Sequence, residues 1–109
     1  MREAISAAVA AGARLVLTTG GTGLTPTDRT PEATAPLLDR EVPGIAEAIR
    51  AAGVAHGVPT AMLSRGLAGI VGDCRVVNLP GSRGGVKDGL GVLEPVVRHA
   101  VEQVVGSDH

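Results

Sequence analysis

One short run of the sequence combines glycines with hydroxyl side chains in a way that suits phosphate binding. It comprises Thr19, Gly20, Gly21, Thr22 and Gly23, and it directly follows a short apolar stretch. Glycines let the backbone approach a ligand closely and adopt positive φ, so that successive N–H groups can form an anion-binding concavity. The threonine hydroxyls add further donors. The run therefore predicts a phosphate-binding loop, with a plain strand-to-helix connection as the alternative interpretation.

An acidic residue, Asp28, follows this loop after a few positions. Its carboxylate could hold a Mg²⁺ ion that bridges phosphate oxygens, because Mg²⁺ prefers oxygen ligands; the alternative is an ordinary surface aspartate. Two familiar nucleotide-binding signatures are excluded. The dinucleotide fingerprint needs a glycine where the chain has Pro26, and a Walker loop needs Ser or Thr after its lysine, whereas Lys87 is followed by Asp88. The predicted loop is therefore of another type.

A second turn, at residues 78–82, could supply the other side of the site. Open α/β sheets bind ligands beyond the carboxyl ends of their strands, and this turn leaves a predicted strand. Asn78 offers both a donor and an acceptor, while Ser82 could contact a phosphate or simply cap the next helix. Arg65, next to Ser64, could clamp a phosphate, although solvated arginines are commoner. These residues become a site only if the two loops meet in space.

The elements that must position these residues alternate between helix and strand, as in an α/β domain. Thr30 is expected to cap a helix, Pro31 suits its first turn, and Pro36 should shorten it. A glycine, Gly53, is expected to end the next helix. The predicted helices are 2–11, one from Thr30, one from Pro43 to Gly53, 85–93 and 94–105; the predicted strands are 15–18, 67–71 and 75–79, the last two forming a hairpin around 72–73.

Composition sets the broad class. The chain has 109 residues, enough for one domain spanning 1–109, with 44% hydrophobic residues but no Phe, Tyr or Trp. A core of aliphatic side chains in so short a chain gains little burial, which favours a homo-oligomer. The net charge of −1 and the lack of aromatic stacking groups argue against nucleic acid. Cys74 is the single cysteine, and no apolar run is long enough to span a membrane, so a cytoplasmic location is expected.

Taken together, these residues resemble the Mog/MoaB family of molybdenum cofactor biosynthesis proteins, which is related to the G domain of gephyrin. The resemblance covers almost the whole chain, in order and with suitable spacing. It rests on residues 15–23, Asp28 with 30–34, 38–44, 63–65 and 78–82. It implies a three-layer αβα domain with a mostly parallel sheet and a short antiparallel hairpin, commonly assembled as a homotrimer or higher homo-oligomer.

The resemblance also implies a reaction, the transfer of AMP from Mg-ATP to the terminal phosphate of molybdopterin with release of pyrophosphate. Carried over by position, the loop from Gly20 to Gly23 would cradle phosphates and Asp28 would assist transfer with Mg²⁺. Four residues of the second turn would border the pterin-phosphate pocket with Ser64 nearby, namely Asn78, Pro80, Gly81 and Ser82. The implied partners are the two substrates, molybdopterin and ATP, and other molybdenum cofactor biosynthesis proteins.

The chain departs from the family pattern at its start. The family domain opens with a strand, a helix and a further strand that carry a second acidic residue, and these would precede Met1. The expected active site is therefore incomplete, and whether the chain is an enzyme stays open. One alternative is a molybdopterin-binding or assembly protein of the MoaB type without catalysis. Another is a generic nucleotide-binding α/β domain such as half of a dehydrogenase, which the missing third glycine disfavours.

Overall fold

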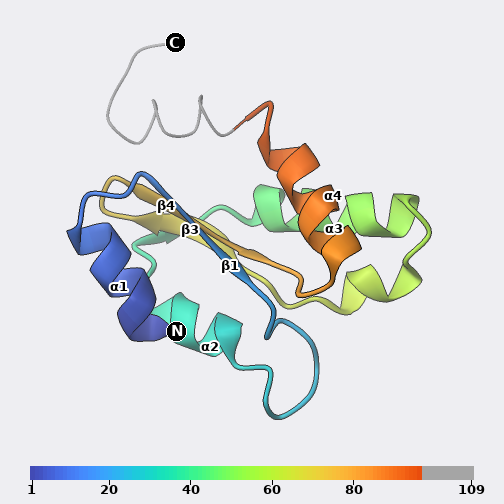
Figure 1. Cartoon of the computed structure of the whole chain (residues 1–109), viewed down its shortest axis with the longest axis horizontal. Helices are drawn as coiled ribbons and strands as arrows, with labels where there is room; N and C mark the ends of the chain where they lie inside the picture. The colour runs from blue at the N-terminus through green and yellow to red at the C-terminus, as the bar shows by residue number, and fades with distance from the viewer. Residues whose placement is uncertain (97–109) are drawn as a thin grey trace.

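The computed structural model describes residues 1–96 as a mixed sheet enclosed by helices on both faces (Figure 1). The elements in chain order are α1 (Arg2–Ala10), β1 (Leu15–Thr19), α2 (Thr30–Thr34), η1 (Ala35–Leu37), β2 (Arg40–Glu41), α3 (Pro43–Ala55), η2 (Pro59–Leu63), β3 (Ala68–Val71), β4 (Cys74–Leu79) and α4 (Arg83–Leu93). The predicted helix 94–105 lies almost entirely outside the described residues. Within residues 1–96, no helix is long and apolar enough to cross a membrane.

The four strands form one sheet in the order β1-β4-β3-β2. β1 and β4 run parallel, with Leu15 opposite Arg75 and Thr19 opposite Leu79. The β3–β4 and β2–β3 pairs are antiparallel, and the turn between β3 and β4 contains Gly72 at φ +59°. The predicted α/β class and the predicted hairpin are confirmed. Among the described strands, one pairing is parallel and two are antiparallel.

The core has two parts because β4 is buried on both faces and its side chains alternate between them. On the side of α3 and α4, the buried cluster is Ala46, Ile49, Ala68, Val77, Leu79 and Leu93. On the side of α1, it is Ile5, Cys74 and Val76. Figure 1 shows the same layering, with α1 and α2 on one side of the sheet and α3 and α4 on the other. The predicted three-layer arrangement is therefore present.

Two expected helix boundaries differ from the structure. The N-cap of α2 is Arg29, and Thr30 instead uses its hydroxyl to donate to the carbonyl of Gly20 at 2.9 Å. α3 continues past Gly53 to Ala55. Gly53 is needed for packing, since a Cβ there would lie 2.5 Å from the Cβ of Ala61 in η2. In both cases a tertiary contact, rather than the local helix signal, decides the role of the residue.

A buried amide joins three elements behind the loops. The side chain of Asn78 donates from Nδ2 to the hydroxyls of Thr18 (2.9 Å) and Thr34 (3.1 Å), and its Oδ1 accepts from the backbone N–H of Leu67 (3.0 Å). Asn78 is only 4% exposed, so water cannot replace these partners. The amide therefore fixes the end of β1, helix α2 and the start of β3 relative to β4.

Replacing Asn78 with alanine should lower the free energy of unfolding by about 2–4 kcal/mol, because the Leu67 N–H and two hydroxyls lose a buried partner. Urea unfolding followed by far-UV circular dichroism measures this loss. Ser6→Ala, on the exposed face of α1, is the control and should change stability by less than about 0.5 kcal/mol. A loss for Asn78→Ala as small as that of the control would contradict the linking role.

Candidate functional site

The two glycine-containing loops lie side by side at one edge of the sheet. The backbone N–H of Gly20 donates to the carbonyl of Leu79 at 3.0 Å, which extends the parallel pairing of β1 and β4 beyond the strands. A Cβ on Gly81 would lie 3.0 Å from the Cα of Gly20, so the two backbones are in close contact. Gly20 and Gly21 have φ values of +83° and +68°. Parallel strands bring their carboxyl ends to the same edge, and here that edge carries both loops.

A cavity of about 450 Å³ opens beside these loops, within the size range of small-molecule sites. It lies between α3, η2 and the start of α4, and its wall is largely apolar. The lining residues from the loops are Gly23, Leu24, Pro80, Gly81 and Ser82; those from the helices and their connections are Ile49, Arg50, Gly53, Val58, Thr60, Ala61, Leu63, Ser64, Gly84, Gly85 and Asp88.

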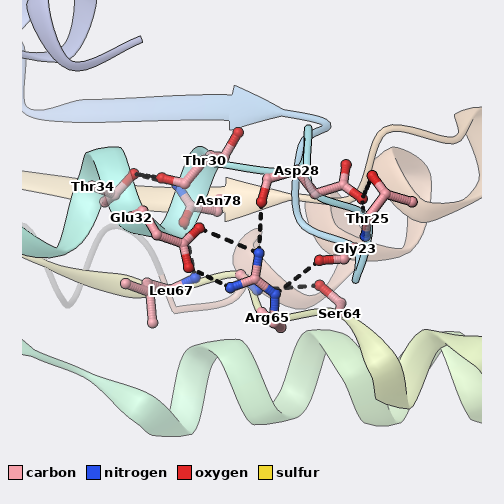
Figure 2. Close-up of polar contacts among 11 residues, drawn as sticks. Gly23, Thr25, Asp28, Thr30, Glu32, Thr34, Ser64, Arg65, Leu67 and Asn78 are labelled. Carbon is pink, nitrogen blue, oxygen red and sulfur yellow. Dashed lines mark hydrogen bonds and ion pairs between the residues drawn. The ribbon is translucent and has the colours of Figure 1, made fainter.

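Arg65 holds the first loop in place, as Figure 2 shows. Its Nε donates to the carbonyl of Gly23 at 2.8 Å, and one Nη donates to the carbonyl of Asp28 at 2.7 Å. Both Nη atoms also bind the carboxylate of Glu32, at 2.5 and 3.3 Å. These hydrogen bonds lower the pKa of Glu32 and raise that of Arg65. The guanidinium is thus occupied within the protein and acts as a brace rather than as a free phosphate clamp.

Asp28 lies next to the cavity rather than in its wall. Its Oδ2 accepts from the hydroxyl of Thr25 at 2.7 Å and from the Thr25 N–H at 3.0 Å. These bonds lower the pKa of Asp28, so its carboxyl group is ionised at neutral pH. Figure 2 shows the carboxylate turned toward Thr25, while the backbone carbonyl faces Arg65. A Cβ on Gly23 would lie 2.7 Å from Oδ2, so this negative charge is adjacent to a residue that lines the cavity.

The structure divides the predicted site residues into two groups. Five of them line the cavity: Gly23, Ser64, Pro80, Gly81 and Ser82. The others lie behind or beside it: Thr19, Gly20, Gly21, Thr22, Asp28 and Asn78. Thr19 is exposed at the end of β1, Thr22 is buried, and the side chain of Asn78 is fully engaged in the links described above. The predicted capping role of one serine is confirmed, because Ser82 Oγ accepts from the N–H of Gly85 at 3.0 Å.

Sequence reasoning missed the part of the cavity that the helices supply. Arg50 on α3 donates to the carbonyls of Ser64 and Gly66 at 3.3 and 3.2 Å, and Asp88 on α4 also lines the cavity. The available signal was a stripe on α4, since Gly84, Gly85 and Asp88 recur at the spacing of one helix face. The stripe carries glycines rather than apolar side chains, so the hydrophobic pattern did not reveal it.

The whole described fold matches a known family. Residues 1–99 match the family described as "Probable molybdopterin binding domain". The chain belongs to this family. Its match to the "Molybdenum cofactor biosynthesis bifunctional protein" of Synechococcus elongatus is 47% identical over 109 residues, 100% of this chain and 34% of that protein. The fold is closely similar to the Mog protein of Mycobacterium ulcerans, with 54% identity and a TM-score of 0.91 over 94% of this chain and 67% of that one.

A further relative of this chain is the "Molybdopterin adenylyltransferase" of Haemophilus influenzae, which is 47% identical over 79 residues. That match covers 72% of this chain and 40% of the relative. The chain thus spans only part of the length of the curated relatives it matches. The predicted relationship to Mog and MoaB proteins is confirmed. The two loops that carried the resemblance are also the two that meet in the structure, at Gly20 and Gly81.

Gly21→Ala should separate the effect of crowding from that of backbone strain. A Cβ at Gly21 would clash with the hydroxyl of Thr30, which donates to the carbonyl of Gly20. Gly72→Ala is a matched control, because Gly72 also has positive φ but nothing within 4 Å of its added Cβ. We expect losses in unfolding free energy of about 2–4 kcal/mol for Gly21→Ala and about 1–2 kcal/mol for Gly72→Ala. Equal losses in urea unfolding would show that the Gly21–Thr30 packing is unimportant.

The Arg65–Glu32 pair should stabilise the protein only while Glu32 is ionised. Because the folded-state pKa of Glu32 is lowered from 4.5, its contribution is present above that value and is lost as the pH falls through the folded-state pKa. Glu32→Gln should therefore be less stable than wild type at neutral pH and converge with it in acid. Chemical unfolding across this range measures the difference. Glu47→Gln, at an exposed position of α3, is the control. If the difference in unfolding free energy between wild type and Glu32→Gln stayed the same at every pH, the stabilising role of the pair would be contradicted.

Proposed function

We propose that this chain takes part in molybdenum cofactor biosynthesis by binding molybdopterin in the cavity and promoting its adenylylation. In this reaction an oxygen of the terminal phosphate of molybdopterin attacks the α-phosphorus of ATP. The new P–O bond forms as the bond between the α-phosphorus and the oxygen that bridges it to the β-phosphorus breaks, and pyrophosphate leaves with that oxygen. The observation that carries the proposal is the contact between the Gly20 and Gly81 loops beside an apolar cavity of ligand size.

The physical chemistry of the loops suits a transfer between phosphates. Such reactions depend mainly on positioning and on neutralising negative charge. The turn at Gly81 and Ser82 leads into the N-terminus of α4, where free N–H groups and the helix dipole favour a phosphate. The positive φ values of Gly20 and Gly21 suit a loop that presents N–H groups to a second phosphate. The apolar wall suits the pterin ring, which would be held away from water.

Mg²⁺ would enter this site together with ATP. Among residues 1–96, no group of three His, Cys, Asp or Glu side chains could hold a metal ion on its own. A single carboxylate fits Mg²⁺ nevertheless, because Mg²⁺ is usually bound through one or two carboxylates, substrate phosphates and water. Asp28 is ionised and has Oδ1 free of hydrogen bonds within the described residues. We assign this carboxylate to the ion, which would offset phosphate charge during transfer.

The proposal includes self-association and contact with other proteins of the same pathway. Large apolar side chains are exposed near the cavity, with Leu24 at 64% and Met62 at 61%. Groups of exposed apolar residues are common at protein interfaces. A homotrimer or a higher homo-oligomer would cover such residues. The proposed location of the protein is the cytoplasm.

Asp28→Asn should slow adenylylation by about 100-fold or more while molybdopterin still binds, because the variant removes charge rather than shape. The assay mixes the chain with molybdopterin and Mg-ATP and quantifies adenylylated molybdopterin and pyrophosphate. Asp73→Asn, an exposed carboxylate in the β3–β4 turn, is the matched control and should retain wild-type activity. Saturable molybdopterin binding by wild type without any AMP transfer would instead indicate a binding or assembly role, and the adenylylation proposal would be rejected.

A further inference from the structure

One charged side chain in the cavity has no role in the proposed transfer. Asp88 lies on the face of α4 that also presents Gly84 and Gly85, and all three line the cavity. Its side chain is 15% exposed. A carboxylate in a largely apolar wall loses hydration, and such groups persist where hydrogen-bond donors satisfy them. Asp88 is therefore a strong candidate for a ligand contact.

The carboxylate is held in a fixed orientation by a neighbouring helix. His56, the C-cap of α3, approaches Asp88 Oδ1 with Nδ1 at 2.6 Å. A carboxylate oxygen is the acceptor in such a contact, and the ring nitrogen is the donor. Among the described residues, no hydrogen bond reaches Oδ2 of Asp88. His56 thus fixes the orientation of the carboxylate, and because each carboxylate oxygen can accept more than one hydrogen bond, both Oδ1 and Oδ2 can still accept from a ligand.

The cationic side chain among the residues that line the cavity does not pair with this carboxylate. Arg50 also lines the cavity, but its Nη1 donates to the carbonyls of Ser64 and Gly66. The salt bridges among the described residues pair Asp88 only with His56. The cavity therefore contains an oriented acceptor pair, and the complementary ligand group is a pair of adjacent N–H donors.

We propose that Asp88 recognises the pyrimidine edge of the pterin ring, accepting hydrogen bonds from its 2-amino group and from N3–H. This inference rests on the proposed function, because that function brings a pterin into the cavity. Asp88 lies six residues after Ser82, about 9 Å along α4 at the usual rise per residue. A phosphate at the N-terminus of α4 and a ring edge at Asp88 would then occupy opposite ends of one ligand. His56 is a positioning residue in this arrangement.

Two matched ligands test this proposal. They are 6-hydroxymethylpterin phosphate and the corresponding lumazine phosphate, in which the 2-amino donor is replaced by a carbonyl acceptor. Because the chain has no Phe, Tyr or Trp, the fluorescence of either ligand can be titrated without protein background. Wild type should bind the pterin at least about tenfold more tightly than the lumazine. The 2-carbonyl oxygen of the lumazine would face a carboxylate oxygen of Asp88, and two acceptors cannot form a hydrogen bond with each other.

Asp88→Asn should reverse this preference. The asparagine carbonyl can accept from N3–H while its amide donates to the lumazine carbonyl, so lumazine should bind more tightly than pterin. A purely structural role for Asp88 would weaken both ligands alike. Asp73→Asn is the matched control and should keep the wild-type preference. His56→Ala should reduce the preference without reversing it, since the carboxylate remains but loses its fixed orientation.

The inference is overturned if Asp88→Asn keeps the wild-type preference, if both ligands weaken equally, or if wild type binds neither ligand. Should Asp88→Asn fail to fold by circular dichroism, Asp88→Glu decides the matter. It retains both acceptors, so it should still prefer pterin, though with weaker binding, and a lost preference would count against the proposal. AMP transfer that persists while the ring preference proves independent of Asp88 would reject this inference alone and leave the proposed function standing.

Discussion

The site depends on the parallel pairing of β1 with β4. That pairing places two chain segments, about sixty residues apart in sequence, at the same edge of the sheet, and Gly20 and Gly81 then touch through their backbones. A side chain on Gly81 would meet the Cα of Gly20 at 3.0 Å, so the contact requires a glycine there. Asn78 supports the arrangement from behind, because its amide joins β1 and α2 to β4. The loop contact is therefore a consequence of the core rather than a local feature of either loop.

Charge holds the remainder of the first loop. The guanidinium of Arg65 binds two backbone carbonyls of that loop and pairs with Glu32 on α2. The backbone N–H of Arg65 donates to the carbonyl of Thr22 at 2.7 Å. Asp28 is fixed separately through Thr25. The two interactions leave Asp28 close to the cavity and ionised, yet not neutralised by a direct bond to the guanidinium. In the proposed transfer, a loop built in this way would offer the carboxylate to Mg²⁺ without rearranging, and the ion would then offset phosphate charge in the transition state.

The sequence predicted those features whose signals are local. Gly72, the apolar run of β1 and the Ser82 cap each identify an element within a few residues, and the structure agrees with them. Features that depend on a distant partner were missed or misplaced. Thr30 was expected to cap α2, but its hydroxyl bonds to Gly20, and Gly53 was expected to end α3, but it makes room for Ala61. The cavity wall was missed for the same reason. Asp88 can be recognised as part of a site only after α3 and α4 pack together and bring His56 into contact with its carboxylate.

The cavity also limits how a chain without aromatic residues could select a ligand. The segments of its wall pack closely together because side chains are absent: a Cβ on Gly85 would lie 2.6 Å from Pro80, and one on Gly53 would lie 2.5 Å from Ala61. Such walls offer an apolar surface but no ring on which a flat ligand could stack. Discrimination among flat ligands must then come from the few polar atoms that face the cavity. A donor or acceptor that a bound ligand removes from water without a partner is costly, so a single oriented carboxylate such as that of Asp88 would be enough to distinguish ring edges that differ in one donor group.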